Sequence, residues 1–198
     1  MNISADRVKE LREWTGAGMM DCNKARTETG GDMDKAVDHL RKIGAAVAAK
    51  KEGRATKDGL VYAYIHPGGR LGVLVEVACE TDFVARTADF QNFVKDIAMH
   101  IAASSPIAVR REDVPADVVE KEKEIFAAQA EASGKPPAVR EKMVAGRVEK
   151  FFQEQVLLEQ PFIRDPKLRV QDLVTAMVAK VGENIGVRRF ARFGLGEG

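Results

Sequence analysis

Cys79-Glu80-Thr81-Asp82-Phe83-Val84-Ala85-Arg86 is the stretch where a strand pattern in the sequence gives way to a helix pattern. Apolar residues alternate with period two before it and recur at helical spacing after it: Leu71, Val73, Val75 and Val77 upstream, and Phe90, Phe93, Val94, Ile97, Ala98 and Ile101 downstream. The chain must therefore turn a corner at residues 81–86. Such a corner lies at the surface, where a rigid scaffold can aim a side chain at a partner. In the commoner arrangement, Asp82 caps the following helix and Phe83 packs beneath it; in the alternative, Phe83 is an exposed functional tip.

Composition allows one or two domains and gives no global attraction to a polyanion. The chain has 198 residues, with 31 basic and 30 acidic side chains and a net charge of +1. Any charged partner must therefore be met by a local patch. Residues 48–57 carry four basic side chains but no aromatic ring on which a base could stack. We therefore expect a solvated linker there.

Signals for bond-making chemistry are weak. Cys22 and Cys79 have no neighbouring Cys or His at zinc-ligand spacing, and no phosphate-binding Gly-x-x-x-x-Gly-Lys-Ser/Thr loop occurs. His39, His66 and His100 have no Ser or Cys in a recognisable nucleophile context. We expect no metal, no cofactor and no enzymatic activity. The amino terminus has no apolar core behind its charges and no apolar run of about 18 residues occurs, which favours a cytoplasmic protein or the mature form of an organelle protein.

Residues 1–45 are expected to form a small three-helix domain. Its helix boundaries follow from caps and glycines: Ser4 to Gly16, Met19 to Thr29, and Asp32 as N-cap to Gly44, with Gly30-Gly31 closing the second helix. Met19 and Met20 cannot both be deeply buried in so small a domain. At least one of them is a candidate for contact with a partner, although filling an irregular core is the more usual role of methionine.

The rest of the chain predicts a linker, a small sheet and several helices. Residues 46–58 read as a helical extension that passes into a linker, and residues 59–198 as an α+β core. The core elements are a strand hairpin of residues 60–66 and 70–79 around Pro67-Gly68-Gly69, a helix at 87–104, an antiparallel helical hairpin at 115–156 with Gly134-Lys135-Pro136-Pro137 at its tip, a helix at 170–181, and a strand at 185–193. These elements predict a three-stranded antiparallel sheet covered by helices, with the helical hairpin projecting from it.

So small a sheet is expected to need cover on both faces. The helix at 87–104 can cover only one face, and an isolated strand hairpin is marginal in water. The other face is therefore open to a second chain.

Several segments closely resemble the signature segments of the elongation factor Ts family. They are residues 11–25, 79–86, 97–103, 133–136 and 180–189, and they follow one another in family order along nearly the whole chain. The chain resembles the short form of the family, which implies a homodimer; Ala191 offers no thiol, so that dimer would be noncovalent. The amino-terminal helices also resemble ubiquitin-associated-type domains. Asn23 stands where the family often has lysine, so a charge contact would be missing here.

The resemblance implies guanine-nucleotide exchange on the translational GTPase elongation factor Tu. It places Leu11, Met19, Met20, Asp21 and Asn23 in the partner-docking domain. It also implies that Thr81, Asp82, Phe83 and Val84 press into the GTPase near its magnesium ion, with Phe83 as the wedge. Direct nucleotide, nucleic-acid or membrane binding is not expected.

Two other readings stay open. The first is a non-enzymatic adaptor whose dimeric core displays binding helices. The second is RNA binding through residues 50–57 and through Arg188, Arg189 and Arg192, which predicts a steep dependence of affinity on salt.

Overall fold

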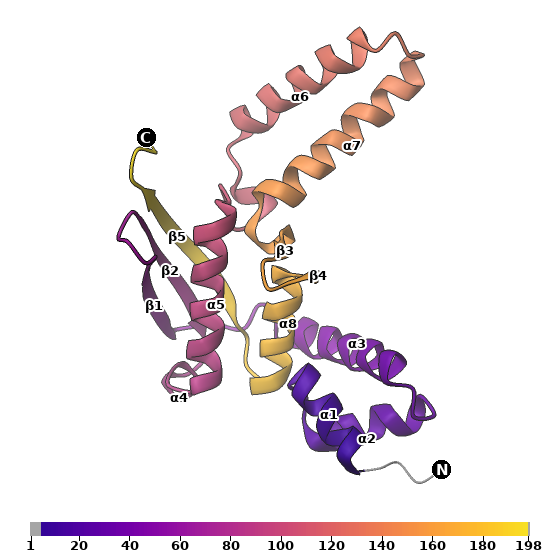
Figure 1. The fold of residues 1–198 in the computed structure, drawn as a ribbon, viewed down its shortest axis with the longest axis vertical. Coiled ribbons are helices and arrows are strands. Elements are labelled where there is room, and N and C mark those ends of the chain that lie inside the picture. The colour runs from indigo at the N-terminus through magenta and orange to yellow at the C-terminus, as the bar shows by residue number, and fades with distance from the viewer. Residues whose placement is uncertain (1–4, 198) are drawn as a thin grey trace. The chain divides into compact units, whose positions relative to one another are not determined.

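The computed structural model describes residues 5–197 and divides them into two compact units. Of the described residues, the first unit contains 5–61, 76–94 and 172–187, and the second contains 62–75, 95–171 and 188–197. In the described residues, eight α-helices and a three-stranded antiparallel sheet confirm the α+β class (Figure 1). Ser4, expected to cap the first helix, lies outside this range. Within it, no helix combines the length and the apolar character needed to cross a membrane.

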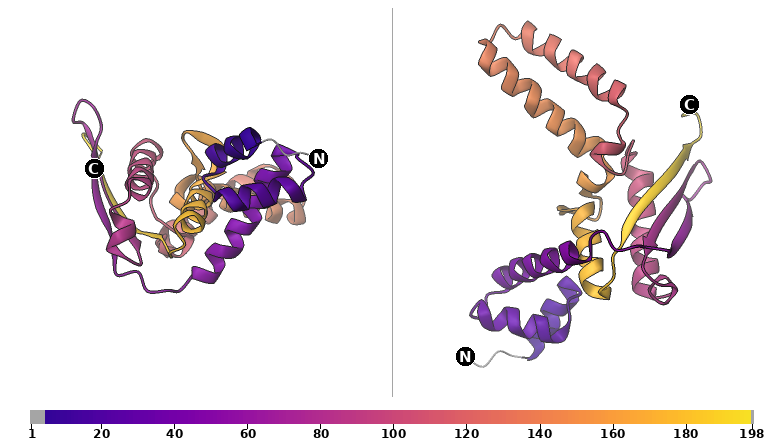
Figure 2. Two further views of the ribbon diagram at one scale, coloured as in Figure 1. Left: turned by 90° about the horizontal axis from the view of Figure 1, so that it is seen from below. Right: turned by 180° about the vertical axis from the view of Figure 1, so that it is seen from behind.

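Three helices lie at the amino terminus, as predicted. They are α1 (Ala5–Thr15), α2 (Met19–Glu28) and α3 (Met33–Lys51). The core between them consists of small and branched side chains: Val8, Leu11, Cys22, Ala25, Ala36 and Leu40. Asp32 caps α3 as expected, since its side chain accepts a hydrogen bond from the Lys35 N–H at 3.1 Å. Figure 2 shows the three helices folded against one another.

The expected end of the third helix at Gly44 is wrong. Helix α3 continues to Lys51, and Gly44 is buried inside it. A Cβ at Gly44 would lie 3.5 Å from the Cβ of Ala179 in α8 (Val170–Val181). The glycine therefore allows α3 and α8 to pack closely. The alanines and lysines after it favour helix, and the helix stops only before Gly53, whose φ is +81°.

The sheet has the strand order β1 (Asp58–Ile65), β2 (Leu71–Cys79), β5 (Gly186–Gly194). The expected hairpin joins β1 to β2, with the His66 N–H donating to the Leu71 carbonyl at 2.8 Å. Gly68 and Gly69 have φ values of +94° and +67°, which the tight turn requires. Arg192 of β5 donates from Nε to the Ala102 carbonyl of α5 (Ala88–Ser104) at 3.2 Å. The strand and the end of this helix therefore lie together in the second unit.

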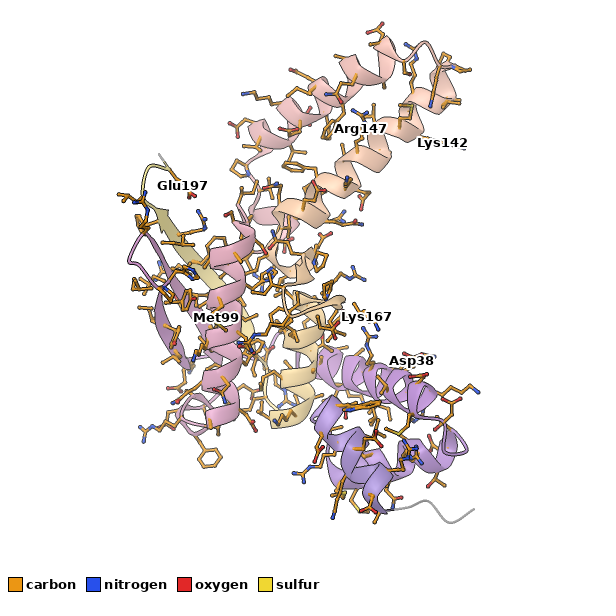
Figure 3. The ribbon with its side chains drawn as sticks, in the orientation of Figure 1. Asp38, Met99, Lys142, Arg147, Lys167 and Glu197 are labelled. Atoms are coloured by element: carbon orange, nitrogen blue, oxygen red, sulfur yellow. The ribbon has the colours of Figure 1, made fainter. Side chains whose placement is uncertain are left out.

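Helices α6 (Ala116–Ala132) and α7 (Pro137–Gln155) form the predicted antiparallel hairpin (Figure 1). Its base is closed by a cluster of Ala108, Val114 and Val156, with Val118, Val119, Phe151 and Phe152 packed against it. At the same end, Arg111 binds Glu149 through two contacts of 2.9 and 2.8 Å and also pairs with Glu159. Arg147 reaches from α7 to the Phe126 ring of α6, with 6.0 Å between the guanidinium carbon and the ring centroid (Figure 3).

Short elements that the sequence did not predict occupy residues 157–169. A 3-10 turn (Leu157–Glu159) leads into β3 (Pro161–Phe162), which pairs antiparallel with β4 (Asp165–Arg169). The sequence gave no strand signal here because each segment contains a proline, Pro161 or Pro166, and proline has no N–H to donate to a neighbouring strand. Helix α8 then begins at Val170, as predicted.

Candidate functional site

The corner at residues 81–86 is a short helix, α4 (Asp82–Ala85), that presents an exposed aromatic ring. The side chain of Phe83 is 76% exposed, which excludes the arrangement in which it packs beneath the following helix and agrees with the alternative of an exposed tip. Val84, the next residue, is 5% exposed and anchors the short helix from below. The corner therefore places one apolar ring in solvent and fixes its neighbour in the interior.

Thr81, rather than Asp82, caps this short helix. The Thr81 side-chain oxygen accepts a hydrogen bond from the Val84 N–H at 3.4 Å, the bond that defines an N-cap. Asp82 occupies the first helical position, is exposed, and pairs with Arg86 at 2.9 Å. A carboxylate in a first helical turn also interacts favourably with the helix dipole. Thr81 and Asp82 are both exposed beside Phe83.

Polar contacts from distant segments surround the start of this corner. Glu80 accepts a hydrogen bond from the Asn184 N–H at 2.7 Å, and its other oxygen lies 3.7 Å from Arg54 Nη1. The Asn184 side chain donates to the Arg54 carbonyl at 2.8 Å. These contacts join the segment before β1, the end of β2 and the segment after α8 within the first unit. The sequence pattern gave no signal for them, since the three segments are far apart along the chain.

Cys79 is a buried structural thiol next to the corner. Its Sγ donates to the Thr81 carbonyl at 3.1 Å. Burial raises the pKa of the Cys79 thiol, and the nearby Glu183 carboxylate raises it further. Cys22, in the three-helix core, also has a pKa raised chiefly by burial. Both thiols are therefore held in the protonated, weakly nucleophilic form.

A second exposed apolar surface lies at the turn between α1 and α2. Met20 is 80% exposed, Trp14 61% and Met19 42%, and we call these three residues the Trp–Met patch. The expectation that at least one methionine faces outward is confirmed. Trp14 was not among the predicted docking residues, although its place at the edge of the apolar face of α1 marks it as a large ring that a small core cannot fully enclose.

The remaining predicted docking residues divide between surface and core. Asp21 and Asn23 are exposed on α2. A Cβ at Gly18 would lie 3.1 Å from the Asp21 carboxylate, so this side chain lies across the amino-terminal end of α2, where negative charge is favourable. Leu11 is fully buried in the three-helix core. Its side chain therefore supports the domain from within and offers no surface to a partner.

Two of the arginines named for the RNA-binding reading, Arg54 and Arg192, have partners inside the chain. Arg54 lies beside Glu80, as described above, and Arg192 pairs with Glu197 as well as with Ala102. Figure 3 labels Glu197 near the carboxyl end of β5. Within residues 5–197, no group of three or more His, Cys, Asp or Glu side chains is arranged to hold a metal ion.

An exposed ring on an anchored corner and a separate group of exposed apolar side chains are features typical of proteins that bind another protein. The family described as "Elongation factor TS" matches residues 6–197 of the chain. An elongation factor Ts of Carboxydothermus hydrogenoformans is 62% identical over 99% of this chain and 90% of its own length. An elongation factor Ts of Caldanaerobacter subterraneus subsp. tengcongensis is 62% identical over 99% of this chain and 98% of its own length. An elongation factor Ts of Geotalea daltonii is 60% identical over 100% of this chain and 92% of its own length.

These matches make the chain a translation elongation factor. It belongs to the elongation factor Ts family. Membership gives it the role of a nucleotide-exchange factor, with the GTPase elongation factor Tu as its partner.

Proposed function

We propose that this protein releases GDP from elongation factor Tu by pressing Phe83 into the GTPase beside its magnesium and phosphate site. The observation that carries the proposal is the 76% exposure of Phe83 on a helix whose next residue, Val84, is buried. A large ring held out in solvent contributes nothing to this chain's own core. It is available to be buried in a partner, where aromatic anchors supply much of the binding energy.

Magnesium makes the nucleotide site sensitive to a small intrusion. The ion demands nearly ideal octahedral geometry and bridges phosphate oxygens of the bound nucleotide. A ring inserted between the elements that supply protein or water ligands shifts at least one of them. Loss of one ligand weakens the hold on the ion and the phosphates together, so GDP leaves faster.

The Trp–Met patch, with Asp21 and Asn23, is proposed to dock on the GTPase while Phe83 acts. Flexible methionines adapt to an apolar surface, and tryptophan is enriched among residues that dominate interface energetics. This division assigns affinity to the Trp–Met patch and the exchange effect to the corner. By linkage, GDP must weaken the binding of this protein to elongation factor Tu by the same factor by which this protein weakens GDP binding.

Release of a fluorescent GDP analogue from elongation factor Tu, followed by stopped flow with and without this protein, tests the proposal. We expect a saturable acceleration that grows with the concentration of this protein. An unchanged release rate would overturn the exchange function and leave the adaptor or RNA-binding reading. Steeply salt-dependent binding to RNA would then separate those two.

We also propose that two copies associate through the open face of the sheet. Arg192 points to α5, so Phe193, the next residue of β5, points to the opposite face. Phe193 is 73% exposed, and Leu195, Ile65 and Leu74 are exposed near it around a shallow hollow of about 470 Å³. This contiguous apolar surface supports the homodimer, in the cytoplasm where translation takes place.

Sedimentation velocity tests the dimer. We expect a dimer for the unmodified chain and a monomer for Phe193→Glu, because the substitution would bury an unpaired charge. Val139→Glu, on the exposed surface of α7, is the matched control and keeps the dimer. A monomer at every concentration of the unmodified chain would contradict the proposal.

A further inference from the structure

We propose that Glu183 is a positioning residue for nucleotide exchange, because its carboxylate holds the corner that carries Phe83. This inference rests on the proposed function. Gly182, with φ of +74°, ends α8 and places Glu183 directly after the helix. The carboxylate is therefore set by a helix end that lies about a hundred residues away in sequence from the corner it contacts.

One carboxylate organises the whole start of the corner. Its Oε2 accepts hydrogen bonds from the backbone N–H groups of Glu80 and Thr81, each at 3.1 Å. Its Oε1 accepts the hydroxyl proton of Thr81 at 2.7 Å. An ionised carboxylate is a strong acceptor that can satisfy all of these donors together.

The contact with Thr81 determines how that residue caps α4. A hydroxyl has one proton to donate. Because Thr81 donates it to Glu183, the hydroxyl lone pairs face the Val84 N–H, which is the capping bond. Glu183, Thr81 and the Val84 amide thus form one directed chain of hydrogen bonds.

A helix as short as α4 depends on such external contacts. Four residues, Asp82–Ala85, are far fewer than an isolated helix needs in water. The cap and the buried Val84 side chain fix its orientation, and Phe83 lies between them. Without the carboxylate, the corner would still exist as a turn, but the direction of the Phe83 ring would vary.

A second carboxylate–amide hydrogen bond links the same two segments, with the acceptor on the corner and the donor on the segment after α8. Glu80 accepts from the Asn184 N–H, so the two segments hold each other through both glutamates. None of these hydrogen bonds involves the Phe83 ring, so the ring stays available to a partner. We therefore propose that Glu183 affects the orientation of Phe83 and not the contact between Phe83 and the partner.

Glu183→Gln tests this inference in the same stopped-flow assay. The amide keeps the shape but has a single acceptor oxygen, and its NH2 group competes with the Val84 N–H for the Thr81 hydroxyl. We expect the maximal rate of GDP release at saturating protein to fall by about tenfold or more, with a smaller change in the half-saturating concentration. Glu124→Gln, at an exposed residue of α6, is the matched control and keeps wild-type exchange.

Three results decide the matter. If wild-type protein fails to accelerate release, the proposed function is overturned and this inference falls with it. If wild-type protein accelerates release and Phe83→Ala impairs it, but Glu183→Gln reaches the wild-type maximum, only the positioning role is overturned. If the two variants both lose maximal rate while circular dichroism shows native secondary structure, the positioning role is supported.

A second variant covers the case in which Glu183→Gln does not fold. Thr81→Val keeps the shape of the side chain and removes the hydroxyl. We expect it to lower the maximal rate as well, and an unchanged maximum would overturn the inference. Where all variants fold, the double variant Glu183→Gln/Thr81→Val should lose little more than either single one, since both interrupt one chain of bonds. Fully additive losses would contradict it.

Discussion

His100 Nε2 lies 2.9 Å from the side-chain oxygen of Gln160, and both residues are buried. The other ring nitrogen, Nδ1, accepts the Ile163 N–H at 3.3 Å, so the proton of the neutral ring lies on Nε2 and is donated to Gln160. Gln160 in turn donates to the Glu154 carbonyl at 2.7 Å and the Ser104 carbonyl at 3.3 Å. The neutral imidazole therefore joins α5 to the short strands and to the end of α7 within the second unit.

This buried ring predicts a loss of stability in acid. Burial lowers the pKa of His100 below its ordinary value of 6.5. As the pH falls below 6.5, the unfolded chain therefore binds a proton at this residue more readily than the folded chain does. The free energy of unfolding should be highest above about pH 6.5 and should fall as the pH decreases, with a slope of at most about 1.4 kcal/mol per unit from this group. Urea unfolding from about pH 7.5 to about pH 5 measures it.

His100→Gln separates this contribution from the other titrating groups. The variant retains a polar side chain but cannot be protonated in this range. Its free energy of unfolding is expected to depend less steeply on pH than that of the wild-type chain, whatever its absolute stability. Parallel pH dependences for the two chains would rule out His100 as the cause.

Phe83→Ala should abolish most of the exchange effect without changing the fold. Truncating a buried aromatic anchor commonly costs 2 kcal/mol or more, which corresponds to roughly a thirtyfold loss in the maximal rate of stimulated GDP release. Since the ring is exposed in the free protein, the thermal midpoint of unfolding should stay within experimental error. Val139→Ala removes another exposed apolar side chain, on α7, and serves as control; a Phe83→Ala variant with wild-type release would exclude the ring as the wedge.

Met20→Ala should affect binding to elongation factor Tu more than it affects the rate at saturation. Met20 is 80% exposed in the Trp–Met patch, so most of its side chain is available to a partner. We expect the half-saturating concentration in the exchange assay to rise about five- to tenfold while the maximal rate is retained. Met143→Ala on α7 is the matched methionine control. A fall in maximal rate at unchanged half-saturation would assign Met20 to the exchange step instead.

Gly59→Ala should destabilise the sheet far more than Gly53→Ala. Gly59 has a φ of +148°, and a Cβ there would lie 2.2 Å from the Val77 carbonyl oxygen of the neighbouring strand, so the backbone must move. Gly53 also has a positive φ, +81°, but a Cβ would meet no atom within 4 Å. We expect losses of about 3 kcal/mol or more at Gly59 and about 1 kcal/mol at Gly53. Equal losses in urea unfolding would show that backbone strain alone accounts for both.

Local patterns were sufficient for most of the helices and strands. Period-two alternation located β2, and helical spacing located α5, the α6–α7 hairpin and α8. The same local view misplaced the end of α3, because Gly44 looks like a helix terminator until Ala179 is brought next to it. It also missed β3 and β4, whose pairing overrides their prolines.

The sequence by itself determined that Thr81–Arg86 is a corner between a strand and a helix, and that this corner carries a ring beside a carboxylate. The local pattern is compatible with both a buried and an exposed Phe83, and within the sequence only the family resemblance implied the exposed ring. Tertiary structure decided that Val84 is buried, that Phe83 is exposed and that Thr81 is the cap. The physical reason is that the Glu183 carboxylate, distant along the chain, binds the amides and hydroxyl at the start of the corner, and long-range contacts of this kind leave no periodic trace in the sequence.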